Sequence, residues 1–201
     1  MTQLIFATGN RHKLEEVREI LADADMEVIS MKEAGIDAEI EENGTSFEEN
    51  ALIKARAVCR ASGKCALADD SGLEVDALGG EPGIYSSRWM GEDTSYHVKN
   101  KELIRLLENV PADKRTARFV CACACVFPDG REYSVRKTFE GIIGWKEKGE
   151  NGFGYDPVFY LPDRKLYSAE LPPKEKNAIS HRGKAMRAMR DILMEEACGR
   201  R

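Results

Sequence analysis

Residues 4–21 read LIFATGNRHKLEEVREIL, and this stretch decides the fold class. Its first part, Leu4–Thr8, is mostly apolar and stops at Gly9-Asn10, which predicts a short buried strand followed by a tight turn. Four apolar residues then recur at helical spacing and would share one helix face: Leu14, Val17, Ile20 and Leu21. A strand that leads through a short loop into an amphipathic helix is the opening unit of an α/β fold.

Strand and helix signals alternate along much of the remaining chain. Glu27–Ser30 predicts a second strand, and Ser46 with Glu49 forms a capping box that begins a second helix, which ends at Gly63. A strand over Cys65–Ala68 would run into A-D-D-S-G (68–72). The later elements that we predict are a hairpin of Thr116–Phe127 and Glu132–Gly144, a strand over Pro157–Leu161 and a helix after Ser180. The pattern indicates a mixed α/β fold with one large hairpin in its sheet.

A further helix is predicted from Thr94, as its N-terminal cap, to Asn109. Its apolar side would consist of the residues that recur at helical spacing: Val98, Leu103, Leu106 and Leu107. His97 lies in a polar part of this helix, where we expect a structural or exposed side chain. The segment Leu73–Gly91 is punctuated by glycine, and we expect irregular structure there.

Composition and charge exclude several classes of protein. The 201 residues carry a net charge of −5 and are 42% hydrophobic and 32% charged, which is ordinary for a globular protein and fits one domain over residues 1–201, with two lobes. A nucleic-acid binder usually has a basic stripe, and none is evident. No apolar run reaches the roughly 18 residues of a membrane helix, and the start lacks a signal peptide. We therefore expect a cytoplasmic protein with no nucleic-acid or membrane partner.

The spacing of the cysteines argues against a metal or disulfide site. Cys121, Cys123 and Cys125 alternate, which on a strand places the three sulfurs on one face. Zinc ligands usually follow C-x-x-C or similar spacing on a turn, and structural disulfides are rare in the cytosol. We expect these residues to be buried as small hydrophobes, without a metal.

Thr8–Lys13, with the sequence T-G-N-R-H-K, has the features of an anion site between a strand and a helix. Gly9 lets the backbone approach a ligand closely. The free N–H groups of a helix start attract anions, and Lys13 adds a mobile positive charge. A Walker A pattern is absent, and an ordinary turn with an exposed lysine is the alternative interpretation.

Asp69 and Asp70 are adjacent carboxylates after a predicted buried strand. Carboxylates suit a hard cation such as Mg²⁺, and a bare pair beside a buried strand would be costly. Neighbouring strand residues point to opposite faces, so both serve one metal only if the chain bends, which Ser71-Gly72 permits. A charged turn is the alternative. Three acids before the second helix could add a ligand, although a solvated surface is the simpler interpretation of the group: Glu39, Glu41 and Glu42.

Two later clusters contain groups that suit the base of a nucleotide. In G-F-G-Y-D-P (152–157), Phe153 and Tyr155 alternate with glycine, and aromatic faces can stack on a base. Two core aromatics beside a turn is the alternative. In K-N-A-I-S-H-R-G-K (176–184), His181 and Arg182 begin the predicted last helix, where a cation is locally unfavourable. We therefore expect a bound acceptor group there, with a solvated basic helix as the alternative.

The clusters, in this order, resemble the inosine triphosphate pyrophosphatase family, also called the Ham1-like non-canonical purine NTP pyrophosphatases. The stretches that carry the resemblance span the chain: TGNRHK (8–13), FEENAxxKA (47–55), ADDSGLEVDALGGEPGIYS (68–86), FGYDP (153–157) and SHRGKA (180–185). The resemblance implies an elongated, twisted mixed sheet with flanking helices, two lobes with the active site in the cleft between them, and a homodimer. Tyr155 stands where other members can have tryptophan.

The resemblance also implies a role for each cluster. Asp70 would be the general base and a Mg²⁺ ligand, with Asp69 close by and with Glu41, chosen over Glu42, as the third acid. Ser71 would touch the substrate. The residues implied for the triphosphate are Thr8, Gly9, Asn10, Arg11, His12 and Lys13. Those implied for the purine are Phe153, Gly154, Tyr155 and Asp156 around the ring, and Lys176, His181 and Arg182 at the base and its 6-oxygen.

The activity implied is Mg²⁺-dependent hydrolysis of ITP, dITP or XTP to the monophosphate and diphosphate. Asp70 would take a proton from the attacking water, and Lys13 would help to hold the charge of the leaving diphosphate. Donors aimed at a 6-keto oxygen would be left unpaired by a 6-amino group, which selects against adenosine. Two rivals are a Maf-like pyrophosphatase, whose first loop we expect to read S-x-S-x-x-R, and a non-catalytic nucleotide sensor, which needs no aspartate pair.

Overall fold

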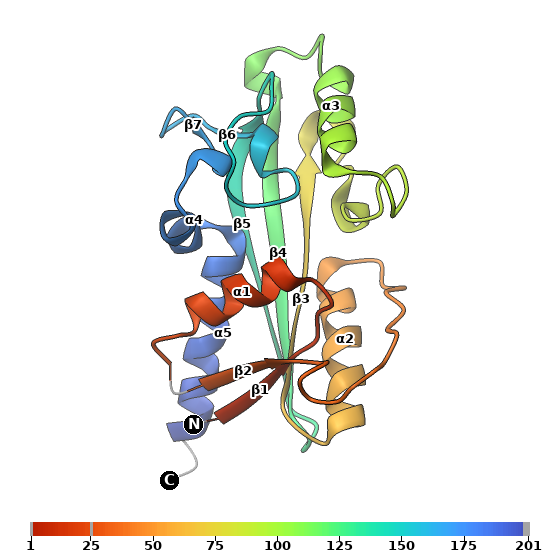
Figure 1. Ribbon diagram of the computed structural model, residues 1–201, viewed down its shortest axis with the longest axis vertical. Coiled ribbons are helices and arrows are strands. Elements are labelled where there is room, and N and C mark those ends of the chain that lie inside the picture. The colour runs from red at the N-terminus through yellow and green to blue at the C-terminus, as the bar shows by residue number, and fades with distance from the viewer. Residues whose placement is uncertain (1, 25, 199–201) are drawn as a thin grey trace. The chain divides into compact units, whose positions relative to one another are not determined.

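The computed structural model describes residues 2–24 and 26–198, and it contains a seven-stranded sheet in the order β2-β1-β3-β4-β5-β6-β7 (Figure 1). Parallel and antiparallel pairs occur in this sheet, and helices accompany it, so the predicted mixed α/β class is confirmed. The chain divides into two compact units. The first unit consists of the chain as far as Asp70, Cys121–Lys137 and the chain from His181 on, and the second consists of Ser71–Val120 and Thr138–Ser180.

The first unit begins with parallel strands. β1 (Thr2–Phe6) pairs with β2 (Met26–Ser30) on one side and with β3 (Ala66–Val75) on the other. Helix α1 (Arg11–Ile20) lies between β1 and β2 in the chain and supplies the crossover connection that parallel strands require. The predicted opening strand is confirmed, although it starts and ends two residues earlier than the apolar pattern indicates.

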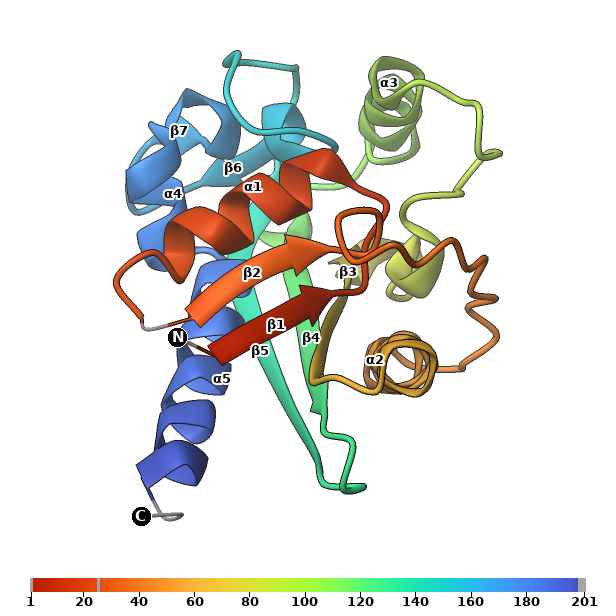
Figure 2. The ribbon, with the colours of Figure 1, turned by 60° about the horizontal axis from the view of Figure 1, so that its bottom comes forward.

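Helices cover both faces of the strands in the first unit. Figures 1 and 2 show α2 (Phe47–Ser62) and α5 (His181–Cys198) on opposite sides of these strands. As predicted, the Ser46 side chain caps α2 by accepting the Glu49 N–H, and Gly63 ends it in the left-handed conformation. Residues of α1, α5 and the strands meet in one buried cluster: Leu4, Phe6, Val17, Leu67, Cys121, Cys123, Cys125, Met186 and Met189. The burial predicted for the three alternating cysteines is confirmed.

Strand β3 is longer than its sequence indicates. The prediction that it ends at Ala68 is wrong, because A-D-D-S-G lies inside the strand Ala66–Val75. Side chains alternate along a strand, so Asp69 and Asp70 point to opposite faces of the sheet. The aspartates tolerate burial in a strand because each finds cationic partners on its own face.

The predicted hairpin consists of β4 (Thr116–Val126) and β5 (Glu132–Ile143). Its turn is closed by a hydrogen bond from the Phe127 N–H to the Arg131 carbonyl, and Gly130 has the positive φ of 90° that the turn requires. In the second unit β5 pairs in antiparallel fashion with β6 (Phe159–Leu161), and β6 pairs with β7 (Leu166–Tyr167). Neither β7 nor helix α4 (Pro173–Ile179) is predicted from the sequence.

Helix α3 (Tyr96–Leu106), also in the second unit, differs from its prediction in its cap and in its buried face. Ser95 caps it, whereas the Thr94 hydroxyl donates to the Met90 carbonyl. Two of the four residues predicted to face the core are largely exposed, namely Val98 and Leu106. Two polar residues are buried in their place, Lys99 and Asn100. The apolar pattern fails here because polar groups of the neighbouring loops face the helix.

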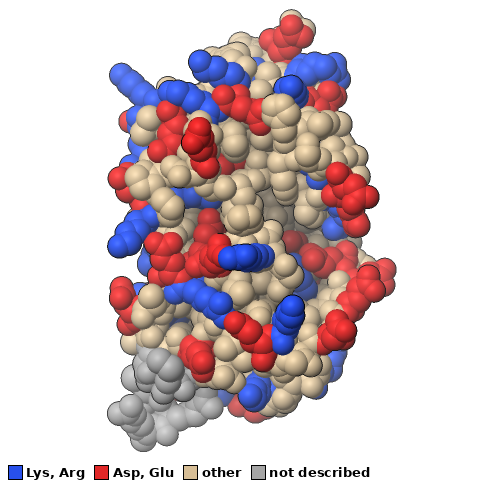
Figure 3. All heavy atoms as spheres, viewed as in Figure 1, with Lys and Arg blue, Asp and Glu red and all other residues tan. Residues whose placement is uncertain are grey.

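No helix among the described residues is long and apolar enough to cross a membrane. On the face drawn in Figure 3, basic and acidic side chains are interspersed rather than gathered by sign. Ion pairs of the described residues include Arg118 with Asp76 and Arg18 with Glu33. Such exposed pairs contribute little to stability.

Candidate active site

Asp69 lies on the face of β3 that α1 and α5 cover. Its Oδ2 is 3.2 Å from Lys13 Nζ and accepts a hydrogen bond from Arg182 Nε at 3.2 Å. Arg182 is only 2% exposed and also donates through Nη1 to Glu16 of α1. Burial by itself would lower the pKa of the guanidinium, but Asp69 and Glu16 raise it above its ordinary value. The cation expected to need an acceptor at the start of α5 therefore finds two carboxylates within the protein.

Asp70 lies on the other face and contacts α2. Its Oδ2 accepts a hydrogen bond from Asn50 Nδ2 at 3.1 Å, and its Oδ1 is 3.7 Å from Lys54 Nζ. Burial raises the pKa of Asp70 above its ordinary value, and Lys54 and Lys13 offset only part of that rise. A buried carboxylate with a raised pKa and a specific cationic neighbour is typical of a functional site.

Asn50 and Lys54 lie in the FEENAxxKA stretch that carries the family resemblance, but the sequence analysis assigned no role to either residue. They stand four residues apart and therefore share one face of α2, and both are buried. The Gly44 N–H donates to Asn50 Oδ1 at 2.9 Å, which turns the Asn50 amide nitrogen toward Asp70. Their position on the predicted buried face of an amphipathic helix was the signal that could have identified them as site residues.

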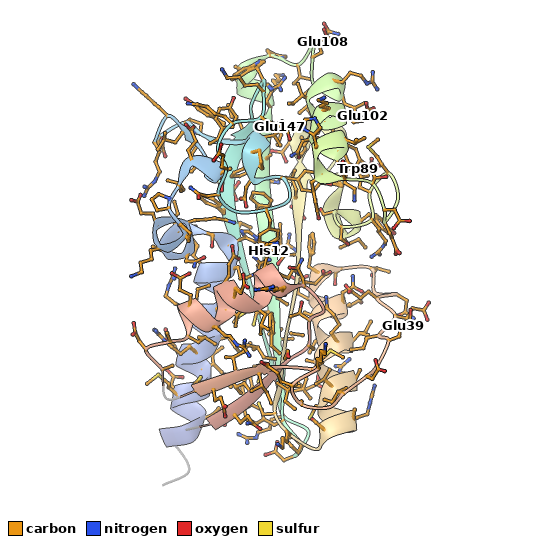
Figure 4. The ribbon with its side chains drawn as sticks, in the orientation of Figure 1. His12, Glu39, Trp89, Glu102, Glu108 and Glu147 are labelled. Carbon is orange, nitrogen blue, oxygen red and sulfur yellow. The ribbon has the colours of Figure 1, made fainter. Side chains whose placement is uncertain are left out.

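The acids before α2 occupy different environments. Glu42 accepts a hydrogen bond from Lys54 Nζ at 3.0 Å and so joins the Asp70 cluster. Glu41 is exposed, and Glu39 lies in the exposed loop before α2 (Figure 4). The choice of Glu41 as a metal ligand stays a prediction, and Glu42 is the acid for which the structure gives a contact.

Two carboxylates contact Lys54, namely Glu42 at 3.0 Å and Asp70 at 3.7 Å. Burial would lower the pKa of Lys54, but Asp70, Asp69 and Glu42 raise it above its ordinary value, so the side chain remains an ammonium ion. Two carboxylates thus face one positive charge, and carboxylate oxygens are the ligands that Mg²⁺ prefers. Among the residues that the structure describes, no three His, Cys, Asp or Glu side chains form a metal-binding group.

The loop from β1 to α1 presents backbone and basic groups to solvent. The Thr8 hydroxyl accepts the Asn10 N–H, and the Asn10 side chain caps α1 by accepting the Lys13 N–H. A Cβ placed on Gly9 would have no atom within 4 Å, so the backbone there is open to close approach. The exposed residues of the segment are Gly9, Asn10, Arg11 and His12, and Figure 4 shows His12 in the first turn of α1.

Asp156 is the centre of a polar cluster in the second unit. Its Oδ2 accepts hydrogen bonds from the Phe153 N–H at 2.9 Å and from Lys176 Nζ at 2.6 Å, and its Oδ1 accepts one from the Ser168 hydroxyl. The Lys176 ammonium also lies 5.0 Å from the centroid of the Phe153 ring. A Cβ on Gly152, whose φ is 73°, would come within 2.3 Å of Asp156 Oδ2. Glycine is therefore required for this loop to fold around the carboxylate.

The two aromatic residues of this loop differ in exposure. Tyr155 is 3% exposed, its hydroxyl donates to the Ser86 carbonyl at 2.9 Å, and its ring packs edge-on against Tyr96. Burial raises the pKa of Tyr155. The core interpretation therefore describes Tyr155, whereas the partly exposed Phe153 has aromatic surface to offer a base.

Comparison with known proteins identifies the family. A model of the Ham1 family matches residues 4–192. The chain belongs to the Ham1 family. A dITP/XTP pyrophosphatase of Desulforamulus reducens is 48% identical over 191 residues, covering 95% of each chain. A dITP/XTP pyrophosphatase of Bacillus cereus is 45% identical and covers 97% of this chain and 96% of the relative. The structure of a HAM1 protein from Coxiella burnetii matches with a TM-score of 0.88 and 39% identity, covering 97% of this chain and 100% of that one.

In this Ham1-family protein the residues expected at the site fall into two groups, one in each unit. The first unit gathers Lys13, Asp69 and Arg182 on one face of β3 and Asp70 on the other, and it contains His181, which is buried at the start of α5. The second unit begins at Ser71 and gathers Phe153, Asp156 and Lys176. The family resemblance stated from the sequence is confirmed.

Proposed function

We propose that this protein hydrolyses the non-canonical purine nucleotides dITP, ITP and XTP to the monophosphate and diphosphate, with Mg²⁺. The observation that carries the proposal is Asp70, a buried carboxylate of raised pKa that contacts Asn50 and Lys54. It stands in a chain that matches dITP/XTP pyrophosphatases along 95% or more of its length.

Asp70 is the general base in this proposal. A raised pKa lies closer to the neutral pH at which the enzyme works. A carboxylate with such a pKa accepts a proton from water more readily. The hydrogen bond from Asn50 fixes the orientation of the carboxylate, and Lys54 keeps a positive charge beside it. Bound Mg²⁺, held by Asp70 and Glu42, would neutralise phosphate oxygens. Glu41 is the alternative acid.

The triphosphate binds, in this proposal, at the exposed start of α1. Thr8, Gly9 and Asn10 offer an open backbone with a helix N-terminus behind it, which favours an anion. Exposed Arg11 adds a positive charge to this turn, and His12 is exposed beside it. Lys13, which lies 3.2 Å from Asp69, adds a positive charge for the leaving diphosphate. Asp69, on the face of β3 away from Asp70, positions the cations Lys13 and Arg182 rather than a metal.

In this proposal the purine is recognised by the residues that the family resemblance implies for it. Phe153 offers its ring, with Gly154 and Asp156 forming the loop around it and Tyr155 supporting that loop from the core. Lys176 donates to Asp156 at 2.6 Å beside the Phe153 ring, and it is the cation that we propose for the 6-keto oxygen of the base. His181, which is buried at the start of α5, is a further base-reading residue that the resemblance implies. Arg182 gives two of its nitrogens to carboxylates, so we place it third. Ser71 touches the substrate.

Product analysis tests this function. The purified protein is incubated with dITP, XTP or dATP, with and without Mg²⁺, and diphosphate, orthophosphate and nucleoside monophosphate are measured. We expect equimolar monophosphate and diphosphate from dITP and XTP, only with Mg²⁺, and little from dATP. Asp70→Asn is the control for a contaminating activity. Release of orthophosphate, or equal rates with dATP, would contradict the proposal, and binding without turnover would indicate the nucleotide sensor.

We further propose that the protein acts as a cytoplasmic homodimer on a free nucleotide, without a nucleic-acid or membrane partner. The family resemblance supports this assembly. Sedimentation velocity measures the mass directly, and a monomer at micromolar concentration would contradict it. Subcellular fractionation tests the location.

A further inference from the structure

Helix α3 buries two polar residues on the side that packs into the second unit. Lys99 and Asn100 are each 1% exposed. Lys99 Nζ donates to the Ser87 carbonyl at 2.6 Å, and burial lowers the pKa of this lysine. Buried polar side chains need partners to be tolerated. Both residues find them in loops, which suggests that α3 holds loops in place.

Asn100 contacts the loop between β5 and β6 at two points. Its Nδ2 donates to Glu147 Oε1 at 2.9 Å and to the Gly154 carbonyl at 3.2 Å. Glu147 lies beside α3 (Figure 4), and its second oxygen is 2.6 Å from His97 Nδ1. His97 and Asn100 are three residues apart on α3, so one face of the helix holds both oxygens of this carboxylate.

The helix also contacts the loop through an aromatic ring. Gly154 has a φ of 68°, and a Cβ there would come within 3.5 Å of the Tyr96 ring. The same ring packs edge-on against Tyr155, with centroids 5.2 Å apart. Tyr96 and Asn100 are four residues apart, so consecutive turns of α3 face consecutive residues of the loop.

Phe153 is therefore held from two directions. Its own N–H donates to Asp156, and the carbonyl of the next residue, Gly154, accepts from Asn100. If Asn100 is replaced, the Gly154 carbonyl loses this hydrogen bond, and the backbone next to Phe153 is restrained by one contact fewer.

We propose that Asn100 is a positioning residue for purine recognition, which fixes the loop that presents Phe153 by binding Glu147 and the Gly154 carbonyl. This rests on the proposed function, in which Phe153 contacts the base. Asn100 itself acts through the loop and not on the nucleotide. A loop that must be ordered on binding lowers affinity. Because base contacts are equal in the ground state and the transition state, their loss raises KM and leaves kcat unchanged.

The test compares Asn100→Ala with Lys101→Ala, a matched change at the next, exposed position of the same helix. Asn100→Asp is the third variant, because it keeps the shape but removes both N–H donors and sets a carboxylate against Glu147. Hydrogen exchange of the segment 150–156 is measured without nucleotide, and kcat and KM are measured with dITP. Thermal melting confirms that each variant is folded.

We expect Asn100→Ala and Asn100→Asp to exchange the Phe153 amide faster and to raise KM by about tenfold, as two lost hydrogen bonds predict, with kcat within about twofold of wild type. Lys101→Ala should match wild type. Hydrogen exchange at the wild-type rate in the Asn100 variants, or a wild-type KM in Asn100→Asp, would overturn the positioning role. Faster hydrogen exchange with a wild-type KM would mean that the order of this loop does not affect purine binding, which would also contradict the proposal. Absence of dITP and XTP hydrolysis in the wild type would refute the proposed function alone, since exchange still decides the role of Asn100.

Discussion

Asp70→Asn separates the catalytic role of this carboxylate from its structural one. The change keeps the shape of the side chain, and the new amide oxygen can still accept the hydrogen bond from Asn50. What is lost is the charge and the ability to accept a proton from water. A general base contributes about a hundredfold to ten-thousandfold in rate, or about 3–5 kcal/mol of barrier. We expect kcat to fall by that factor.

The same substitution should stabilise the fold at neutral pH. Burial of a carboxylate costs several kcal/mol, and attraction to Lys54, 3.7 Å away, returns about 4 kcal/mol at an effective dielectric near 20. These magnitudes nearly cancel, and the raised pKa of Asp70 shows that burial outweighs attraction. The protonated carboxyl of Asp70 is therefore favoured more in the folded state than in the unfolded state. The stability that this protonation contributes is complete below the ordinary pKa of aspartate, and it is lost as the pH rises through the pKa of Asp70 in the folded state.

The neutral amide lacks this dependence. Asp70→Asn should match the wild type in stability near pH 4 and exceed it at about pH 7. Urea denaturation followed by circular dichroism, in EDTA so that no metal contributes, measures the free energy of unfolding at both pH values. Diphosphate release gives kcat. A variant that keeps more than about a tenth of kcat, or that is less stable than the wild type at neutral pH, would refute this reasoning.

Other parts of the structure lead to further expectations. Gly152→Ala should lower the melting temperature and raise KM for dITP, because its Cβ would come within 2.3 Å of Asp156 Oδ2; wild-type values for both would contradict the loop geometry. Arg182→Ala should lower the free energy of unfolding in urea by about 3 kcal/mol, because it removes the buried cation that Asp69 and Glu16 share. If its preference for dITP over dATP is unchanged, the residue supports the site without reading the base. The alternating cysteines should hold no stoichiometric zinc by elemental analysis. Diamide should join Cys65 to Cys125, whose sulfur atoms are 3.3 Å apart, and peptide mass spectra without that link would exclude the pairing.

Several features of the fold were predictable because they depend on neighbours in the sequence. The cap at Ser46 and the end of α2 at Gly63 each follow from a few adjacent residues, and both are confirmed. The hairpin turn at Gly130 is another local signal. The alternation of Cys121, Cys123 and Cys125 correctly indicated a buried strand face, because a period of two has one simple structural meaning.

The environment of the candidate site was not predictable in this way. The sequence could indicate that Asp69 and Asp70 carry function, but their adjacency suggested a turn, whereas the structure extends them in β3 with opposite partners. Those partners come from distant positions: Asn50 is 20 residues from Asp70, and Arg182 is 113 residues from Asp69. A local sequence pattern can indicate that a charged side chain is buried at a cost in free energy. It cannot indicate which distant residue supplies the compensating charge.

The same reason explains the buried face of α3. The apolar pattern of the helix predicts that Val98 and Leu106 are buried, because amphipathic helices ordinarily bury their apolar side. The tertiary structure reverses this choice, since the Gly154 carbonyl and Glu147 stand where Asn100 can bind them. The sequence by itself determined the α/β class, both ends of α2 and the hairpin turn. Only the tertiary structure decided which polar groups meet, because a buried polar side chain is stable only where the fold brings it a partner.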